Sequence, residues 1–148
     1  MKIEEEIKQD KFQSVHHKAI INLLYTANWI QSKHQEFLKP FGITAQQFNI
    51  LRIMRGQFPK SISASEIKSR MLDRNSDVSR LLDRLALKEL ISKSTCASDK
   101  RANDVCITDK GLDLLSRISI DQKIFVSFLK LSEEEAEKLS DLLDRSRS

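Results

Sequence analysis

Apolar residues recur along the chain at spacings that predict helices. The longest pattern runs from about Ser14 to Lys39 and stops at Pro40 and Gly42, residue types that end helices. Its positions repeat every three or four residues, as in a heptad whose stripe packs along another helix. The stripe consists of His16, Ile20, Leu23, Ala27, Ile30, His34, Phe37 and Phe41.

Further helices are marked by their first residues. In a capping box, a hydroxyl residue and a Glu or Gln three positions later bind each other's backbone amides. The three candidate pairs are Thr44 with Gln47, Ser63 with Glu66, and Ser132 with Glu135. The helices predicted after the first one cover residues 44–55, 64–72, 76–89, 109–130 and 133–145.

Residues 90–108, LISKSTCASDKRANDVCIT, break the helical period. Their β-branched residues alternate with polar ones on both sides of a charged tip, which predicts a two-stranded hairpin. Thr108 is the expected N-cap of the next helix. The sequence therefore predicts a mainly α fold with one small β-hairpin.

The helix predicted over residues 76–89 has one narrow apolar stripe, formed by Val78, Leu81, Leu82 and Leu85. A short helix, a tight turn and such a helix form a helix-turn-helix, whose second helix fits the DNA major groove. Arginine can bind guanine or phosphate there. A solvated polar face is the alternative interpretation. The residues expected opposite the stripe are Ser76, Ser79, Arg80 and Asp83, with Arg84 beside them.

Positive charge is concentrated around this helix. Residues 52–101 hold 12 of the 25 Lys and Arg residues but only 6 of the 21 Asp and Glu residues. This segment therefore carries a net charge of +6, whereas the whole chain carries +4. Such clustering favours a polyanionic partner.

Four segments together resemble the MarR-type transcriptional regulators, a family of dimeric bacterial winged helix-turn-helix proteins. They are ITAQQFNILRIM (43–54), SDVSRLLDRLALKELI (76–91), SDKRA (98–102) and ITDKG (107–111). The resemblance implies a single domain over residues 1–148. Its DNA-binding region would cover 43–108, and long N- and C-terminal dimerisation helices would cover 12–40 and 109–146.

The resemblance also implies roles for individual residues. Residues 76–84 would form the recognition helix, and Arg101 would enter the minor groove at the wing tip. Asp83 would pair with a wing arginine and so support the wing. The family binds double-stranded, pseudo-palindromic operators as homodimers, usually as repressors, and many members release DNA when a small molecule binds. The residues expected to contact DNA are Asn75, Ser76, Asp77, Ser79, Arg80, Arg84, Lys100 and Arg101.

Three positions depart from the family pattern. Glu89 stands where glycine is common, so the helix must end in another way. Lys68 stands where a small residue usually packs between helices, and Asp77 stands where a hydroxyl is usual. An acid at residue 77 repels phosphate, although it can accept a hydrogen bond from cytosine.

The two cysteines, Cys96 and Cys106, lie on opposite sides of the predicted hairpin tip. With a turn at Asp99 and Lys100, Cys106 would lie across from about Lys93. The sulfurs would then be about three residues out of register, roughly 10 Å at ~3.3 Å per residue, which is too far for a disulfide. Zinc would need two further ligands, and none is nearby. Structural cysteines and a redox-sensing thiol are the interpretations left open.

Other polar and aromatic residues allow two interpretations each. His16 and His34 lie about 27 Å apart along a helix at ~1.5 Å per residue, so they cannot share a metal within one chain. They are interface or surface histidines, or ligands of a metal between subunits. A candidate ligand pocket, for which a core cluster is the alternative, consists of Tyr25, Trp29, Phe48 and Arg52.

Composition excludes several classes of protein. Hydrophobic residues make up 40% and charged residues 31%, which is typical of a soluble domain. No apolar run approaches the ~20 residues of a membrane span, and the start of the sequence lacks a signal peptide, so we expect a cytoplasmic protein. No glycine loop, metal-ligand spacing or nucleophile–base pair indicates an enzyme, a cofactor or a metal.

The interpretation that best fits all of these features is a sequence-specific DNA-binding transcriptional regulator. The alternative is a winged-helix protein-interaction module that does not bind DNA. The basic segment 52–101, with an arginine at the predicted wing tip, favours the regulator.

Overall fold

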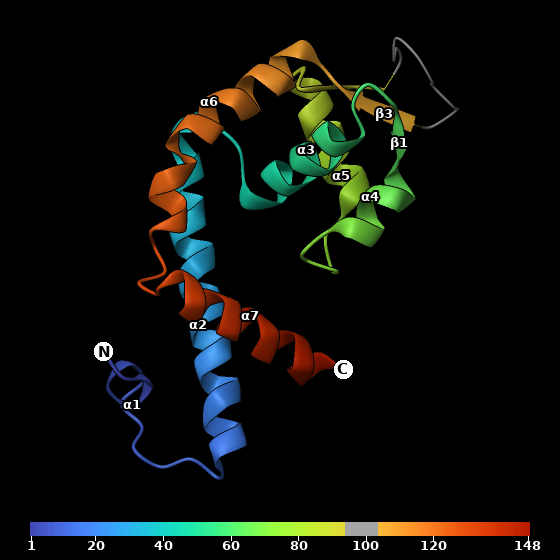
Figure 1. Ribbon diagram of the computed structural model, residues 1–148. Coiled ribbons are helices and arrows are strands. Elements are labelled where there is room, and N and C mark those ends of the chain that lie inside the picture. Colours follow the sequence, from blue (N-terminus) through green and yellow to red (C-terminus); the bar gives the residue numbers. More distant parts are fainter. Residues whose placement is uncertain (94–103) are drawn as a thin grey trace.

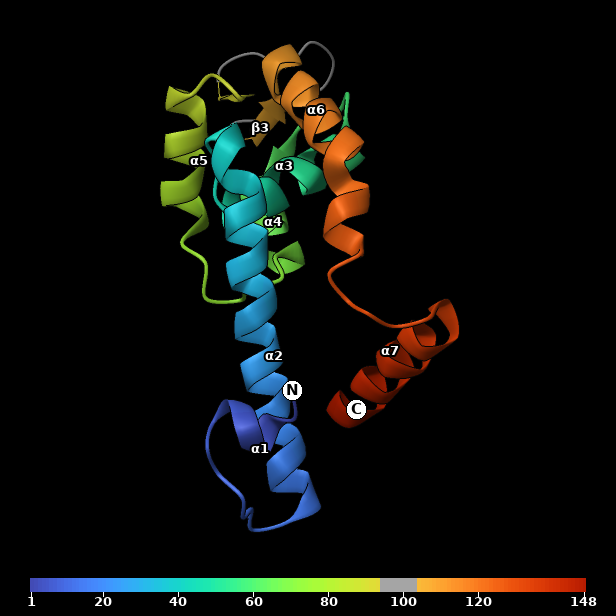
Figure 2. The same ribbon diagram turned by 90° about the vertical axis from the view of Figure 1, so that its left-hand side faces the viewer.

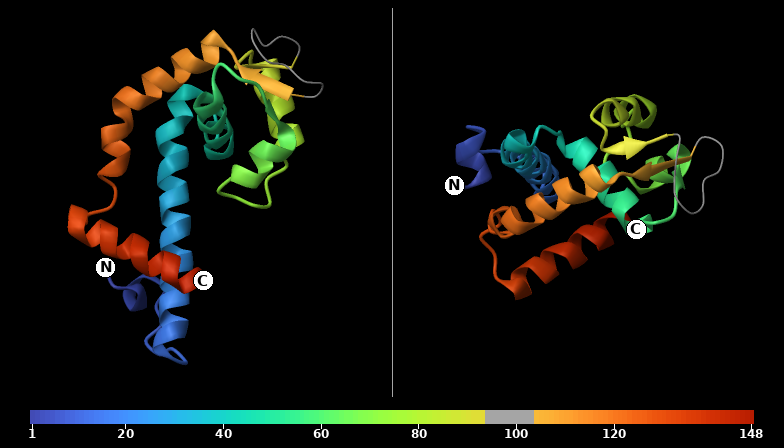
Figure 3. Two further views of the ribbon diagram at one scale, coloured as in Figure 1. Left: turned by 45° about the vertical axis from the view of Figure 1, so that its right-hand side comes forward. Right: turned by 90° about the horizontal axis from the view of Figure 1, so that it is seen from above.

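The structure of the protein is a computed structural model that describes residues 1–93 and 104–148, with only the backbone for 120–125. A compact unit of short helices and strands lies at one end, and the long helix α2 (Val15–Leu38) projects from it (Figure 1). Both termini lie toward the end of the molecule away from the sheet (Figure 3).

Helix α2 confirms the long helix predicted from the heptad pattern. It begins after Ser14, whose hydroxyl accepts the backbone amide of His17 at 3.0 Å. It ends in a 3-10 turn, η1 (Lys39–Phe41), and Gly42 then adopts a left-handed φ of 73°. This conformation is inexpensive for glycine, so the chain can reverse direction toward the compact unit.

A short helix, α1 (Ile3–Glu6), folds against the first half of α2, and no sequence pattern predicted it. Ile3 is buried, and the hydroxyl of Tyr25 donates a hydrogen bond to Glu6 at 2.7 Å. Lys18 of α2 forms an ion pair with Glu4. These contacts join segments that are far apart in sequence.

The compact unit contains the predicted helix-turn-helix. Its helices are α3 (Ala45–Gln57), α4 (Ala64–Arg70) and α5 (Val78–Leu87). The capping box at Thr44 and Gln47 is confirmed. At the start of α4 only half of the predicted box forms, because Glu66 pairs with Arg70 at 3.1 Å instead of reaching back to the backbone of Ser63.

A three-stranded antiparallel sheet flanks these helices, in the order β1–β3–β2. Strands β2 (Ile91–Ser92) and β3 (Asp104–Ile107) form the base of the predicted hairpin, while the tip lies outside the described residues. Strand β1 (Ile62–Ser63) pairs with β3 and was not predicted. Two residues are too few to show the alternation by which strands are recognised.

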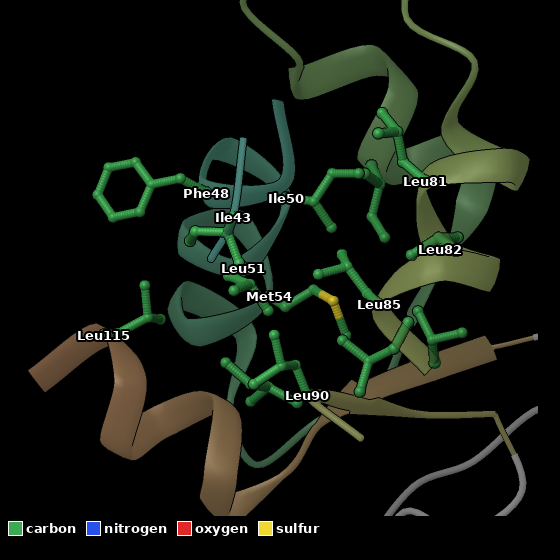
Figure 4. Close-up of a cluster of buried hydrophobic side chains, with 14 of the residues drawn as sticks. Ile43, Phe48, Ile50, Leu51, Met54, Leu81, Leu82, Leu85, Leu90 and Leu115 are labelled. Atoms are coloured by element: carbon green, nitrogen blue, oxygen red, sulfur yellow. The ribbon is translucent and has the colours of Figure 1, made fainter. Parts of the chain in front are cut away.

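Helix α3 lies at the centre of the hydrophobic core (Figure 4). Its side chains Ile50, Leu51 and Met54 are buried between α5 on one side and α6 (Asp109–Val126) on the other. The predicted apolar stripe of α5 is confirmed, because all four of its side chains are buried. Among the described residues, the large hydrophobic side chains that are fully buried are Leu38, Ile50, Leu51, Met54, Ile67, Leu85, Leu115 and Ile118.

The two C-terminal helices follow the predicted order. Thr108 caps α6 as expected, since its hydroxyl accepts the amide of Gly111 at 3.1 Å. Helix α6 ends at Val126, four residues earlier than predicted. Helix α7 (Glu133–Arg147) begins with the predicted capping box of Ser132 and Glu135, and it has no buried residue. It lies away from the compact unit (Figure 2).

Gly111 allows α6 to pack closely against the end of α5 and against β3. A Cβ at this position would lie 2.4 Å from the carbonyl oxygen of Leu90 and 2.7 Å from Cγ1 of Ile107. We expect Gly111→Ala to lower the free energy of unfolding by about 1–3 kcal/mol, measured by urea denaturation at a fixed protomer concentration.

Gly56 in α3 offers a matched control, because a Cβ there would meet no atom within 4 Å. Gly56→Ala should raise the free energy of unfolding by up to about 1 kcal/mol through helix propensity. Equal effects of the two substitutions would contradict the close contact at Gly111.

Candidate nucleic-acid interface

Helix α5 presents a polar face to solvent, opposite the stripe that it buries on α3. Ser79, Arg80, Asp83 and Arg84 are all exposed, as the helical period predicted. Two guanidinium groups four residues apart therefore lie on one side of the helix. This arrangement suits a helix that enters a groove of DNA with its polar face foremost.

Ser76 was predicted on this exposed face, and that prediction is wrong. Its relative exposure is only 4%, and its hydroxyl lies 3.5 Å from the amide nitrogen of Gln46, a hydrogen-bond donor from α3. The prediction extended the helical period to residue 76, but α5 begins at Val78. Residues before the helix start do not follow its 100° rotation.

Asp77 is the N-cap of α5, which gives its carboxylate a structural role. Its Oδ1 accepts the backbone amide of Arg80 at 3.2 Å. Aspartate is among the best N-cap residues, because the helix start leaves unpaired amides. Aspartate in place of the usual hydroxyl residue therefore still caps the helix, and it adds a negative charge.

The turn before α5 is held against α3 by polar side chains. The amide of Gln46 donates to Asp73 at 3.1 Å, and Asn49 accepts the backbone amide of Leu72 at 2.9 Å. The backbone amide of Asn75 is bound by Asp73 at 2.9 Å, and the residue itself is exposed. These hydrogen bonds therefore hold the segment that leads into α5 against α3.

An ion pair joins the polar face of α5 to the hairpin. Asp83 pairs with Lys93, which directly follows β2. The expected partner of Asp83 was a wing arginine. Arg101 and Lys100 lie outside the described residues, so their predicted contacts stay predictions.

Helix α5 ends without the glycine that is common at this position. Glu89 adopts a left-handed φ of 61°, and its amide binds the carbonyl of Ala86 at 3.0 Å. The amide of Leu90 binds the carbonyl of Leu85 at 3.1 Å, which completes a Schellman motif. The hydroxyl of Thr108 donates to the carbonyl of Glu89 at 2.7 Å and holds this non-glycine residue in place.

Comparison with known proteins and the arrangement of α3, α4 and α5 both indicate a helix-turn-helix protein. Residues 43–102, which include α3, α4, α5 and β2, match the model of the MarR family. A MarR transcription factor from Planctomyces limnophilus has 26% sequence identity, and the match covers 93% of this chain and 98% of that one with a TM-score of 0.66. Over residues 43–102 the chain is similar to the MarR family.

Other relatives have similar architectures at lower identity. MepR from S. aureus, solved in complex with DNA, is 24% identical, with 90% of this chain and 96% of that chain covered and a TM-score of 0.72. The E. coli HTH-type transcriptional regulator PapX is 23% identical over 100 residues. That match covers 68% of this chain and 61% of PapX. Members of the MarR family are DNA-binding transcription factors rather than enzymes.

Cys106 is disulfide-bonded, so the prediction that it forms no disulfide is wrong. The only other cysteine, Cys96, lies outside the described residues. That prediction assumed regular strand pairing from the base of the hairpin to its tip, whereas the described residue pairs cover only the base. There Cys106 lies opposite Ser92, and not opposite Lys93 as predicted.

The four residues of the candidate ligand pocket do not line a common cavity among those found in the described part of the protein. Phe48 is buried, with the ring of His34 edge-on at 5.5 Å and the guanidinium of Arg52 at 5.7 Å from its centroid. Tyr25 and Trp29 are each more than a third exposed on α2. Phe48 is thus a core residue, the alternative interpretation of this cluster.

A concavity lies instead between the end of α2, the start of α3 and the end of α5. Its volume is about 770 Å³. Three cationic side chains line it, from Lys39, Arg84 and Lys88, together with the carboxylate of Glu36. Sequence patterns did not indicate this concavity, because its walls come from three separate segments.

The described residues were compared with the requirements of a metal site and of a membrane-spanning helix. No cluster of three potential metal ligands occurs among residues 1–93 and 104–148. None of the helices in the described part is long and apolar enough to cross a membrane.

His34 should make stability depend on pH. Burial lowers the pKa of its imidazole below the ordinary value of 6.5. The unfolded chain therefore binds this proton more tightly than the folded protein does. Stability is fully present above about pH 6.5 and declines as the pH falls toward the lowered folded-state pKa.

Urea denaturation at about pH 7.5 and pH 5.5 tests this expectation. The loss of stability on acidification should be smaller in His34→Gln than in the parent. His16→Gln, at an exposed histidine of the same helix, should behave as the parent does. Identical losses in the parent and His34→Gln would exclude the contribution of His34.

Proposed function

We propose that this protein acts in the cytoplasm as a homodimeric repressor that binds a pseudo-palindromic operator and releases it when a small molecule binds. The observation that carries the proposal is the exposed face of α5, where Ser79, Arg80 and Arg84 lie opposite a buried apolar stripe. An α-helix with such a face fits the major groove, about 12 Å wide.

Within this proposal, α5 is the recognition helix. Arg80 is the best candidate for base reading, because a guanidinium can donate two hydrogen bonds to one guanine. Arg84, one turn later, would bind a second base or a phosphate. Asn75, Lys100 and Arg101 would add contacts on the two sides of the helix, and Asp83 would support the wing through Lys93.

The homodimer is supported by apolar side chains that the protomer leaves uncovered. They gather on the first half of α2, at the end of α6 and on α7, where no side chain is buried. A two-fold partner would cover them and place two recognition helices on successive turns of the same DNA face. The exposed residues are Val15, Ile20, Leu23, Leu24, Val126, Leu129, Leu131, Leu139 and Leu142.

The response to a small molecule is supported by the concavity at the end of α5. Arg84 both lines this concavity and belongs to the proposed DNA-binding face. A molecule bound beside Arg84 would compete with DNA for the same guanidinium. The effector site is therefore proposed here and not at Tyr25 and Trp29.

Arg80→Ala tests base reading by α5. An operator is first selected from a pool of random duplexes with the full-length protein. The substitution should cost about 1–3 kcal/mol on that operator and much less on scrambled DNA. Arg117→Ala removes an arginine of α6 that pairs with Asp113 and should leave both affinities unchanged.

If the parent selects no DNA sequence and binds no duplex at low salt, the proposed function fails. The winged-helix protein-interaction module then becomes the better interpretation.

Leu24 and Leu142 test the dimer, since their relative exposures in the protomer are 60% and 59%. The parent should have twice the mass of one chain by light scattering. Leu24→Glu and Leu142→Glu should each shift it toward the monomer, because a buried carboxylate at an apolar interface is costly. Leu72→Glu, at an exposed leucine of the helix-turn-helix, should stay dimeric. A monomeric parent would contradict the proposal.

A further inference from the structure

A second, smaller groove lies beside the proposed recognition helix, between α4 and the start of α5. Its volume is about 490 Å³. Ala64, Ser65 and Lys68 of α4 form one wall, and residues 75–79 form the other. The groove is mainly lined by groups that bind oxygen anions: an ammonium, an amide and hydroxyls.

Lys68 is the only cation that lines this groove in the described part of the chain. It follows Ile67, which is fully buried in the core, and it lies four residues after Ala64, so both residues share the groove-facing side of α4. Its side chain is exposed and forms no ion pair with any described carboxylate, in contrast to Arg70 of the same helix, which pairs with Glu66.

Asp77 faces the same groove and carries the opposite charge. Its carboxylate caps α5 by accepting the amide of Arg80. Without Lys68 the groove would carry a single negative charge and repel an anion. With Lys68 the two charges offset each other, and the hydroxyl of Ser79 can bind oxygen. The hydroxyl of Ser65 lies 3.2 Å from that of Ser63, with which it forms a hydrogen bond. Two residues that depart from the family pattern, one from α4 and one from the start of α5, thus lie on facing walls.

The position of the groove indicates which part of a DNA duplex would lie against it. Ser79 lines the groove and directly precedes Arg80, the proposed base-reading residue. A helix with its side chains is about 10–12 Å in diameter and fills the major groove, so the DNA backbone must pass beside it. Helix α4 packs against α5 on this side (Figure 1), so its groove-facing residues would lie beside the DNA backbone.

We propose that Lys68, with the hydroxyl of Ser79, binds a phosphate of the DNA backbone beside the recognition helix and offsets the charge of Asp77. This inference rests on the proposed DNA-binding function. Lys68 is a positioning residue, since a phosphate contact fixes the placement of α5 without carrying sequence information.

A double-substitution cycle tests the proposal. The four full-length proteins are the parent, Lys68→Ala, Asp77→Ser and the double variant. Serine is also a good N-cap, so Asp77→Ser removes the charge without removing the cap. Affinity is measured on the selected operator and on a scrambled duplex, between about 50 and 200 mM salt.

Lys68→Ala should weaken binding to both duplexes by the same factor. Each lost phosphate contact lowers the salt slope by about 0.9, and a dimer loses two contacts. The ratio of parent to variant affinity should therefore fall about tenfold between the lowest and the highest salt. Asp77→Ser should strengthen binding to both duplexes, and the double variant should return close to the parent.

Two further variants separate a phosphate contact from a structural role. Lys68→Arg should retain the parent's affinity and salt slope. Arg70→Gln, on the same helix but outside the groove, should leave both unchanged. Thermal unfolding of all variants should match that of the parent.

Three results would overturn the proposal. They are an unchanged affinity and salt slope in Lys68→Ala, a loss confined to the operator, and a double variant that binds no better than Lys68→Ala. A parent that binds neither duplex would instead refute the proposed function, and this inference with it.

Discussion

Burial of one stripe of α5 against α3 is the constraint on which the candidate interface depends. Val78, Leu81, Leu82 and Leu85 are all less than 9% exposed. Fully burying a leucine or valine side chain is worth about 1.5–3 kcal/mol, and burying an unpaired guanidinium is costly. Rotating α5 about its axis would expose the apolar side chains and bury the guanidinium groups. The hydrophobic core therefore determines which residues α5 presents to solvent.

Polar contacts then fix the two ends of this helix. At its start, Asp77 caps the first turn, while Gln46 of α3 holds Asp73 in the preceding turn. At its end, Glu89 closes the helix in a left-handed conformation that Thr108 supports from the start of α6. The contacts of Gln46 and Thr108 join the two ends of α5 to α3 and to α6. These contacts consequently fix the direction of the α5 axis, while the buried stripe fixes the rotation of α5 about that axis.

Helix α2 links the two parts of the molecule. At its C-terminal end Leu38 is fully buried in the core, whereas its first half leaves large apolar side chains exposed. In the proposed dimer, the direction of α2 would therefore set the distance between the two recognition helices. The concavity that contains Arg84 lies where α2 meets the compact unit, so a molecule bound there would contact both parts.

The sequence by itself determined the helices from α2 to α7, because capping and apolar periodicity are local. The start of α3 at Thr44, the buried stripe of α5 and the exposure of Arg80 all follow from spacings within one segment. Only the tertiary structure decided which segments meet. Strand β1 exists because β3 pairs with it, and Ser76 is buried because Gln46 of α3 covers it. Lys68 and Asp77 share a groove because α4 packs on α5, and a pattern along one segment carries no information about its neighbours.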